Sequence, residues 1–288
     1  MIAETASAKI NLYLHVGPRR QDGLHELASL FVFAEKGDEI SVAPAGGLAL
    51  NIKGPYSAAL SDLPPEKNLA WRAAALLKEQ CGVMGGAAIL LEKNLPIASG
   101  IGGGSADAAA ALRALIRLWR IDISDEALAK LAFRLGADVP ACLSGAPVNV
   151  SGAGERIEKA PDLPPLWVCL VNPGVDMPTG AIFRAFDEAH PAPPAPEQVA
   201  LPARDIDALT VALGNTRNNL EPIARRLAPQ IGAVIESIGA CPGALMARMS
   251  GSGATCFGLF ASAEAAAHAE SEARRRNWWT LASRLRLR

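Results

Sequence analysis

The pattern of hydrophobic and polar residues changes its period along the chain. A period of two, typical of strands, occurs at 8–16, 27–34, 38–44, 48–54, 86–93 and 166–173, in a strand pair over 244–260, and at 278–288. A period near 3.6, typical of helices, occurs at 68–82, 105–119, 124–136, 178–189, 204–213, 219–239 and 262–276. This mixture predicts a chain of mixed α and β structure.

Local signals set the ends of two predicted helices and a domain boundary. Asn68 is a candidate N-cap with Gly82 just past the helix end, and Ser124 and Gly136 bracket the helix at 124–136. The strand pattern restarts after a loop-like stretch, and we therefore predict an N-terminal domain over 1–158 and a C-terminal domain over 159–288. A Pro-rich segment at 190–202 is predicted to be a surface excursion or a linker.

Composition excludes several classes of protein. The 288 residues include 28 Lys and Arg against 29 Asp and Glu, so no bulk charge favours nucleic acid or a membrane surface. The chain start lacks a secretory pattern, and no apolar run reaches the roughly 20 residues of a membrane span. Five scattered cysteines without C-x-x-C spacing predict reduced thiols and a cytoplasmic location. We expect neither a zinc site nor a dedicated metal cage.

A glycine-rich stretch lies between the predicted strand at 86–93 and the helix that follows. Gly100 and Gly102–Gly104 precede Ser105, so backbone N–H groups and the positive end of a helix would meet at one place. A P-loop requires a lysine near its end, and this stretch has none. A dinucleotide fingerprint requires a third glycine at the position where this chain has Ser105. A plain strand-to-helix turn is the alternative, but the glycine density favours a phosphate site.

Four stretches together resemble the GHMP kinase superfamily. Pro96–Ala106 (PIASGIGGGSA, here called the glycine loop) resembles its phosphate motif, and MSGSGATCFGLF at 249–260 resembles its C-terminal motif. Residues 8–27 and 135–145 are similar to the branch that acts on 4-diphosphocytidyl-2-C-methyl-D-erythritol. The resemblance implies a two-domain GHMP kinase fold of the α+β class, with an S5-like N-terminal and a ferredoxin-like C-terminal domain. It also implies transfer of the γ-phosphate of ATP to a hydroxyl group.

Two catalytic residues follow from the resemblance. Asp138 matches the aspartate that accepts the proton of the attacking hydroxyl, and Lys9 matches the lysine that offsets negative charge beside it. Read without the resemblance, Asp138 would more often be a helix cap and Lys9 a solvated strand residue. Lys9 nevertheless interrupts an otherwise apolar strand, which a surface position explains poorly.

The resemblance also implies a site for ATP with Mg²⁺. It assigns the phosphates to the glycine loop: Pro96, Ile97, Ala98, Ser99, Gly100, Ile101, Gly102, Gly103, Gly104, Ser105 and Ala106. The hydroxyl of Ser105 is a candidate for the β-phosphate or Mg²⁺, and the ion is expected to travel with ATP. Asn68 and Lys93 match positions near the adenine, although a helix cap and an exposed strand-end lysine explain them equally well.

The acceptor substrate is expected to contact a further set of residues. Asn11 lies two positions after Lys9 on the same strand face and could reach the substrate polyol. His25 and Phe183 match positions that hold the cytosine by hydrogen bonding and by stacking, although a lone Phe183 would by default be core. The chain departs from the family at Leu24, where an aromatic residue usually covers the other face of the base.

Other classes of function are weighed against this one. The C-terminal RRRNWWTLASRLRLR could suggest nucleic-acid binding, but its alternation fits a strand with a solvated arginine face. Another GHMP kinase, of the homoserine or mevalonate type, would share the glycine loop and differ in the acceptor pocket. A catalytically inactive relative is disfavoured by the presence of both Lys9 and Asp138. We therefore expect a small-molecule substrate, with neither nucleic acid nor membrane as a partner.

Overall fold

The computed structural model describes residues 1–287 and divides them into two compact units. The first comprises Met1–Ala8, Lys36–Ile97 and Gly102–Gly145, and the second comprises Lys9–Glu35, Ala98–Ile101 and the described residues from Ala146 onward. Two long strands, β1 (Ile2–Arg19) and β2 (His25–Ala45), contribute residues to both units. The glycine loop also contributes residues to both units, with Ala98–Ile101 in the second unit and the rest in the first. The division at residue 158 stays a prediction.

The first unit has a small sheet beside a group of helices. Strand β4 (Gly86–Glu92) pairs antiparallel with the second half of β2 and parallel with β3 (Leu48–Lys53). The short 3-10 helices η1 (Ala58–Leu60) and η2 (Pro65–Lys67) lead into α1 (Leu69–Gln80). The other helices are α2 (Gly103–Trp119), α3 (Asp125–Leu135) and α4 (Val139–Ser144).

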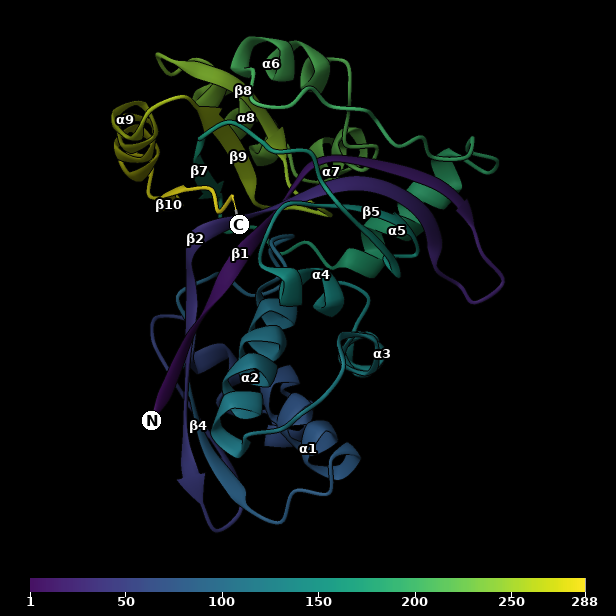
Figure 1. The fold of residues 1–288 in the computed structure, drawn as a ribbon. Coiled ribbons are helices and arrows are strands. Elements are labelled where there is room, and N and C mark those ends of the chain that lie inside the picture. The colour runs from purple at the N-terminus through teal and green to yellow at the C-terminus, as the bar shows by residue number, and fades with distance from the viewer. Residues whose placement is uncertain (288) are drawn as a thin grey trace. The chain divides into compact units, whose positions relative to one another are not determined.

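Small side chains explain how the two longest helices of this unit pack. Figure 1 shows α1 and α2 side by side. Helix α2 buries Ala106 and Ala108–Ala111 completely or nearly so, and α1 buries Ala70, Ala73 and Ala74. Alanine stabilises helices and adds little bulk, so the two backbones can approach closely. The alanine-rich run after the glycine loop is therefore core.

The second unit contains a sheet of four antiparallel strands. Its order is β10 (Trp279–Arg284), β7 (Trp167–Asn172), β9 (Cys256–Phe260) and β8 (Ala244–Met249). Helices α7 (Glu221–Leu227) and α8 (Gln230–Gly239) come between β7 and β8, and α9 (Ala263–Arg274) comes between β9 and β10; α8 and α9 pack on the sheet (Figure 1). This β-α-β-β-α-β order is ferredoxin-like, as expected.

The second unit also contains a short strand group and two more helices. The first half of β2 pairs with β5 (Val148–Gly152), which pairs with β6 (Arg156–Lys159). Helices α5 (Thr179–Ala189) and α6 (Ile206–Gly214) precede α7. The core includes Val171, Phe260, Ile238 and Ala269, from the sheet and its two covering helices.

Several boundaries differ from the predicted ones for identifiable reasons. The segments at 27–34 and 38–44 form one strand, because Gly37 lets β2 pass β1: a Cβ there would lie 1.9 Å from the carbonyl oxygen of Ala6. The helical stretch at 219–239 contains two helices, split at Pro229, which cannot continue a helix begun before it. Helix α4 and strands β5 and β6 were not predicted.

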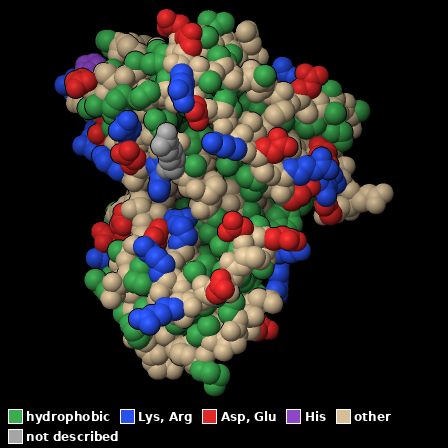
Figure 2. Space-filling model, in the orientation of Figure 1, with side chains coloured by type: hydrophobic (Ala, Val, Ile, Leu, Met, Phe, Trp, Pro, Cys, Tyr) green, Lys and Arg blue, Asp and Glu red, His purple; other side chains and the backbone are tan. Residues whose placement is uncertain are grey.

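The last strand of the chain is shorter than predicted. The strand predicted at 278–288 is found at Trp279–Arg284, and its last residue, Arg288, lies outside the described residues. On the face drawn in Figure 2, positive and negative side chains are interspersed. Within residues 1–287, every helix is too short or too polar to cross a membrane.

Candidate active site

The second half of the glycine loop forms the start of α2 in the first unit. Gly102 is the N-cap residue, with a left-handed φ of 65° that glycine adopts without strain, and no side chain caps this helix end among the described contacts. The amides at the start of a helix have no partner within it. Gly103, Gly104 and Ser105 therefore present N–H groups at the positive end of a 17-residue helix, which suits a phosphate group.

The first half of the glycine loop belongs to the second unit, where it packs on residues 249–255. The amide of Thr255 donates to Ser99 O at 3.1 Å, and Ser250 Oγ donates to Gly100 O at 3.1 Å. Gly100 has a φ of 75°, and a Cβ there would lie 2.5 Å from Ser250 O. Glycine is thus required at this position because two backbone segments meet, which the sequence motif alone did not reveal.

Lys9 and Asn11 lie on β1 in the second unit, and both are buried. The ammonium of Lys9 lies 4.1 Å from the centre of the Phe31 ring, so the interpretation of Lys9 as a solvated strand residue is wrong. Asn11 Nδ2 donates to Ser29 Oγ at 3.0 Å. The buried Oδ1 of Asn11 has no hydrogen-bond partner within the described part of the chain. An unsatisfied buried acceptor is costly, and a ligand hydroxyl would satisfy it.

Asp138 lies in the first unit, immediately before α4. It occupies the N-cap position, but its side chain makes no capping hydrogen bond among the described contacts. The short helix instead has Pro140 in its first turn and ends at Gly145, which has a left-handed φ of 59°. The capping interpretation of Asp138 therefore does not explain why the residue is aspartate.

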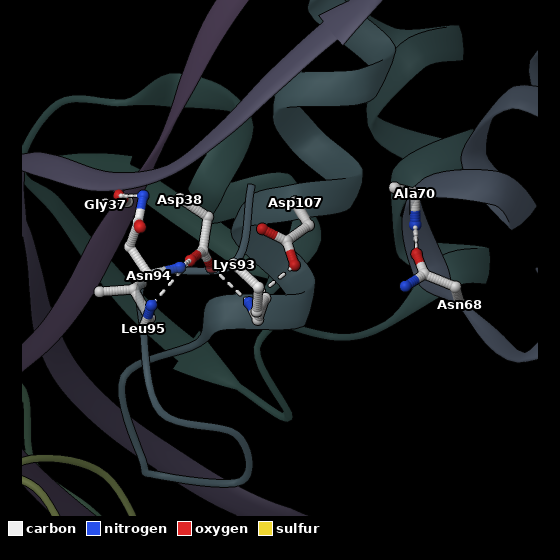
Figure 3. Close-up of polar contacts among 8 residues, drawn as sticks. All are labelled: Gly37, Asp38, Asn68, Ala70, Lys93, Asn94, Leu95 and Asp107. Carbon is white, nitrogen blue, oxygen red and sulfur yellow. Dashed lines mark hydrogen bonds and ion pairs between the residues drawn. The ribbon is translucent and has the colours of Figure 1, made fainter. Parts of the chain in front are cut away.

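Lys93 is buried in the first unit between two aspartates (Figure 3). Its Nζ contacts Oδ2 of Asp38 and lies 2.8 Å from Oδ2 of Asp107. Burial disfavours the ammonium, but the carboxylates of Asp107 and Asp38 outweigh it and raise the pKa of Lys93. Burial raises the pKa of Asp107 to about 7, with the Lys93 ammonium opposing the rise. Lys93 is therefore not an exposed strand-end lysine.

Asp38 and Asp107 were not singled out from the sequence. Asp38 is completely buried and Asp107 is 3% exposed. The available signal was an aspartate at the start of an apolar strand and another among the alanines of a buried helix face. A charged residue in such surroundings needs a partner of opposite sign.

Asn68 is the N-cap of α1, as predicted. Its Oδ1 accepts a hydrogen bond from the amide of Ala70 at 2.9 Å (Figure 3). The cap accounts for an asparagine at this position. Its assignment near the adenine stays a prediction.

His25 and Phe183 meet in the second unit. Their ring centres are 5.1 Å apart with an interplanar angle of 32°. Nδ1–H of His25 donates to Gly17 O at 3.0 Å, and Nε2 lies 3.1 Å from Oδ1 of Asp187. Asp187 stands one helical turn after Phe183 on α5, so one face of this helix presents both residues to the histidine. Leu24 is 45% exposed, which places it outside the core.

Two family models match the chain. The model described as the GHMP kinases N-terminal domain matches residues 68–146, and that described as GHMP kinases C-terminal matches residues 198–278. The chain is 47% identical over 280 residues to a 4-diphosphocytidyl-2-C-methyl-D-erythritol kinase of Parvibaculum lavamentivorans, covering 96% of each chain. It is 48% identical over 275 residues to one of Jannaschia sp., covering 95% of this chain and 94% of the relative.

The chain is also similar to solved structures of kinases. A crystal structure of a 4-(cytidine 5'-diphospho)-2C-methyl-D-erythritol kinase aligns with a TM-score of 0.78 and 36% identity, covering 99% of both chains. A homoserine kinase from Cytophaga hutchinsonii aligns with a TM-score of 0.68 and 19% identity, covering 98% of this chain and 95% of that one. A mevalonate kinase from L. major aligns at 0.69 and 15%, covering 96% and 94%. The last two share the fold only.

Proposed function

Because the chain belongs to the 4-diphosphocytidyl-2-C-methyl-D-erythritol kinases of the GHMP superfamily, we propose that it transfers the γ-phosphate of ATP to the 2-hydroxyl of 4-diphosphocytidyl-2-C-methyl-D-erythritol. The observation that carries the proposal is identity close to one half over nearly the full length of the relatives. The product would be the 2-phosphate together with ADP. Reduced cysteines are in keeping with action in the cytoplasm, which is part of the proposal.

The nucleotide would bind with its phosphates at the start of α2. The uncapped amides of Gly103, Gly104 and Ser105 support this, because they offer several donors to one anion. Mg²⁺ carried with ATP would neutralise charge on the phosphates, and the Ser105 hydroxyl is the oxygen proposed for the ion or the β-phosphate. Asn68 and Lys93 keep their proposed place in the nucleotide site.

Asp138 and Lys9 would perform the chemistry. The Asp138 carboxylate accepts the proton of the 2-hydroxyl as that oxygen forms its bond to the γ-phosphorus and the bond to the leaving ADP breaks. The Lys9 ammonium would offset negative charge on the phosphoryl group as it is transferred. The burial of Lys9 supports a functional role for this lysine.

The acceptor would bind to residues of the second unit. The unsatisfied Oδ1 of Asn11 supports a hydrogen bond to a substrate hydroxyl. Phe183 offers a ring for stacking on cytosine, and Asp187 and Gly17 orient the His25 ring beside it. The exposed Leu24 can cover one face of the base by dispersion only.

A coupled ADP-release assay with a panel of alcohols tests the proposal. With ATP and Mg²⁺, 4-diphosphocytidyl-2-C-methyl-D-erythritol should give the highest kcat/KM, and mevalonate and homoserine should react negligibly. If mevalonate or homoserine reacts faster than the cytidine substrate, the proposed acceptor is wrong, although the chain would still be a kinase.

A further inference from the structure

Three charged side chains are buried together beside the start of α2. Lys93 is 3% exposed, Asp38 is completely buried, and Asp107 lies in the second turn of the helix (Figure 3). Removing charges from water costs several kcal/mol each, and an ion pair in such a place often contributes little net stability. The burial of three ionisable groups here therefore calls for a role besides stability.

Among these three side chains, the ammonium of Lys93 lies nearest to the Cβ position of Gly103. A Cβ added to Gly103 would lie 3.1 Å from Nζ of Lys93 and 3.7 Å from Oδ2 of Asp38. Gly103 is the first residue of α2 and one of those that present uncapped amides. Nζ is closer to this position than the Asp38 carboxylate oxygen, so the charge nearest the first turn of α2 is positive.

Both carboxylates hold this ammonium in one place. Oδ2 of Asp38 and Oδ2 of Asp107 bind it from a strand and a helix, respectively. The other oxygen of Asp38 accepts the amides of Asn94 and, at 2.8 Å, Leu95. Asp38 thus fixes both the Lys93 side chain and the backbone that leads from β4 into the glycine loop.

The backbone of Lys93 is fixed as well. Its amide donates to Lys53 O at 2.7 Å, and its carbonyl accepts from the amide of Tyr56 at 3.2 Å. Gly54, with a φ of 97°, passes so close that a Cβ there would lie 2.7 Å from Lys93 O. With its main chain and its head group both engaged, Lys93 is poorly placed to turn toward a base.

We propose that Asp38 and Asp107 are positioning residues that hold the Lys93 ammonium against the first turn of α2, where it strengthens binding of the phosphate groups and does not read the adenine. This inference rests on the proposed nucleotide site. It assigns a function to Asp38 and Asp107, which were not predicted as site residues. It also places Lys93 at the phosphate groups of the nucleotide instead of at the adenine.

The test compares ATP with inorganic tripolyphosphate, which has phosphates and no base. The double variant Lys93→Met with Asp38→Asn removes one charge of each sign. It leaves no ammonium unpaired, and the asparagine oxygen keeps an acceptor for the amides of Asn94 and Leu95. Without Lys93, burial favours the neutral form of Asp107. Dissociation constants for ATP are measured by calorimetry, and tripolyphosphate is measured as a competitor. We expect both to weaken by the same factor, tenfold or more, with the KM of the acceptor changed less than twofold.

A matched control uses an exposed pair next to the cluster. Lys53 and Glu92 form an ion pair of 2.8 Å with side chains 55% and 40% exposed. Lys53→Met with Glu92→Leu removes the same charges from neighbouring positions, and we expect the affinities for ATP and tripolyphosphate to stay within twofold of the wild type.

The possible results separate the inference from the function. Loss of ATP affinity with unchanged tripolyphosphate affinity would mean that Lys93 reads the base, and a folded double variant with normal affinity for both would leave the cluster a structural role only. Either result overturns the inference while the wild type stays an active kinase. Should the double variant not fold, Asp38→Asn alone preserves the acceptor for the two amides and should weaken ATP and tripolyphosphate equally. An inactive wild type would instead contradict the proposed function.

Discussion

Replacing Asp138 with asparagine separates a catalytic base from a helix cap. Asparagine caps helices about as well as aspartate but cannot accept the proton of the attacking hydroxyl at neutral pH. Loss of a general base costs 10²–10⁴-fold in rate, or about 3–5 kcal/mol of activation free energy. The side chain of Asp138 makes no described capping bond to α4, so the roughly 1 kcal/mol typical of a cap is not lost. We expect a large fall in kcat and nearly unchanged stability.

A second aspartate provides the control. Asp205 caps α6, and its Oδ1 accepts the amide of Ala208 at 3.0 Å. Asp205→Ala should therefore cost about 0.5–2 kcal/mol of stability, seen as a drop of a few degrees in Tm, with kcat unchanged. The assays are steady-state ADP release at saturating substrates and thermal unfolding by circular dichroism. If Asp138→Asn keeps more than a tenth of kcat, or follows Asp205→Ala in losing stability alone, Asp138 is not the base.

The other predictions concern the glycine loop, the cytosine site and a buried arginine. Gly103→Val would press a branched side chain on Nζ of Lys93 and on the phosphate position, so ATP affinity by calorimetry should collapse in a folded protein; near-normal affinity would exclude Gly103 from the site. Leu24→Tyr should lower the KM of the cytidine substrate roughly 2–13-fold through stacking, and Phe183→Ala should raise it more strongly, both without effect on the KM of ATP. If Leu24→Tyr leaves that KM unchanged and lowers Tm, residue 24 is not in the pocket. Arg248 donates four hydrogen bonds of 2.7–3.1 Å to backbone and hydroxyl oxygens, so Arg248→Lys should lose roughly 2–5 kcal/mol in denaturant unfolding, and a loss below about 0.5 kcal/mol would contradict this.

Periodicity predicted most of the regular structure because it follows from which face of an element is buried. The helix after Asn68 begins where the cap was predicted, and the alanine-rich helix begins within two residues of its predicted start. Gly37 shows where such reasoning fails. The strands at 27–34 and 38–44 were predicted as separate, whereas Gly37 between them marks the close approach of β1 and β2, a tertiary contact with no local signal.

The candidate site was predicted mainly by motif resemblance, because single residues are ambiguous without their surroundings. Lys9 and Lys93 were each open to interpretation as exposed lysines, and both are buried. Asp38 and Asp107 were missed because they are far apart in sequence and only the fold brings them to Lys93. Which atoms of His25 are already engaged also depends on Asp187, more than 150 residues away.

Phosphorus NMR of the reaction mixture tests the central claim most directly. One equivalent each of ATP and 4-diphosphocytidyl-2-C-methyl-D-erythritol should give ADP and one new phosphomonoester resonance in equal amounts. Carbon 2 of the substrate bears no hydrogen, so a phosphate on its hydroxyl shows no three-bond coupling to a proton. A singlet without proton splitting is the expected result. ADP without a phosphomonoester, or a phosphomonoester split by carbon-bound protons, would contradict the claim that this chain phosphorylates the 2-hydroxyl.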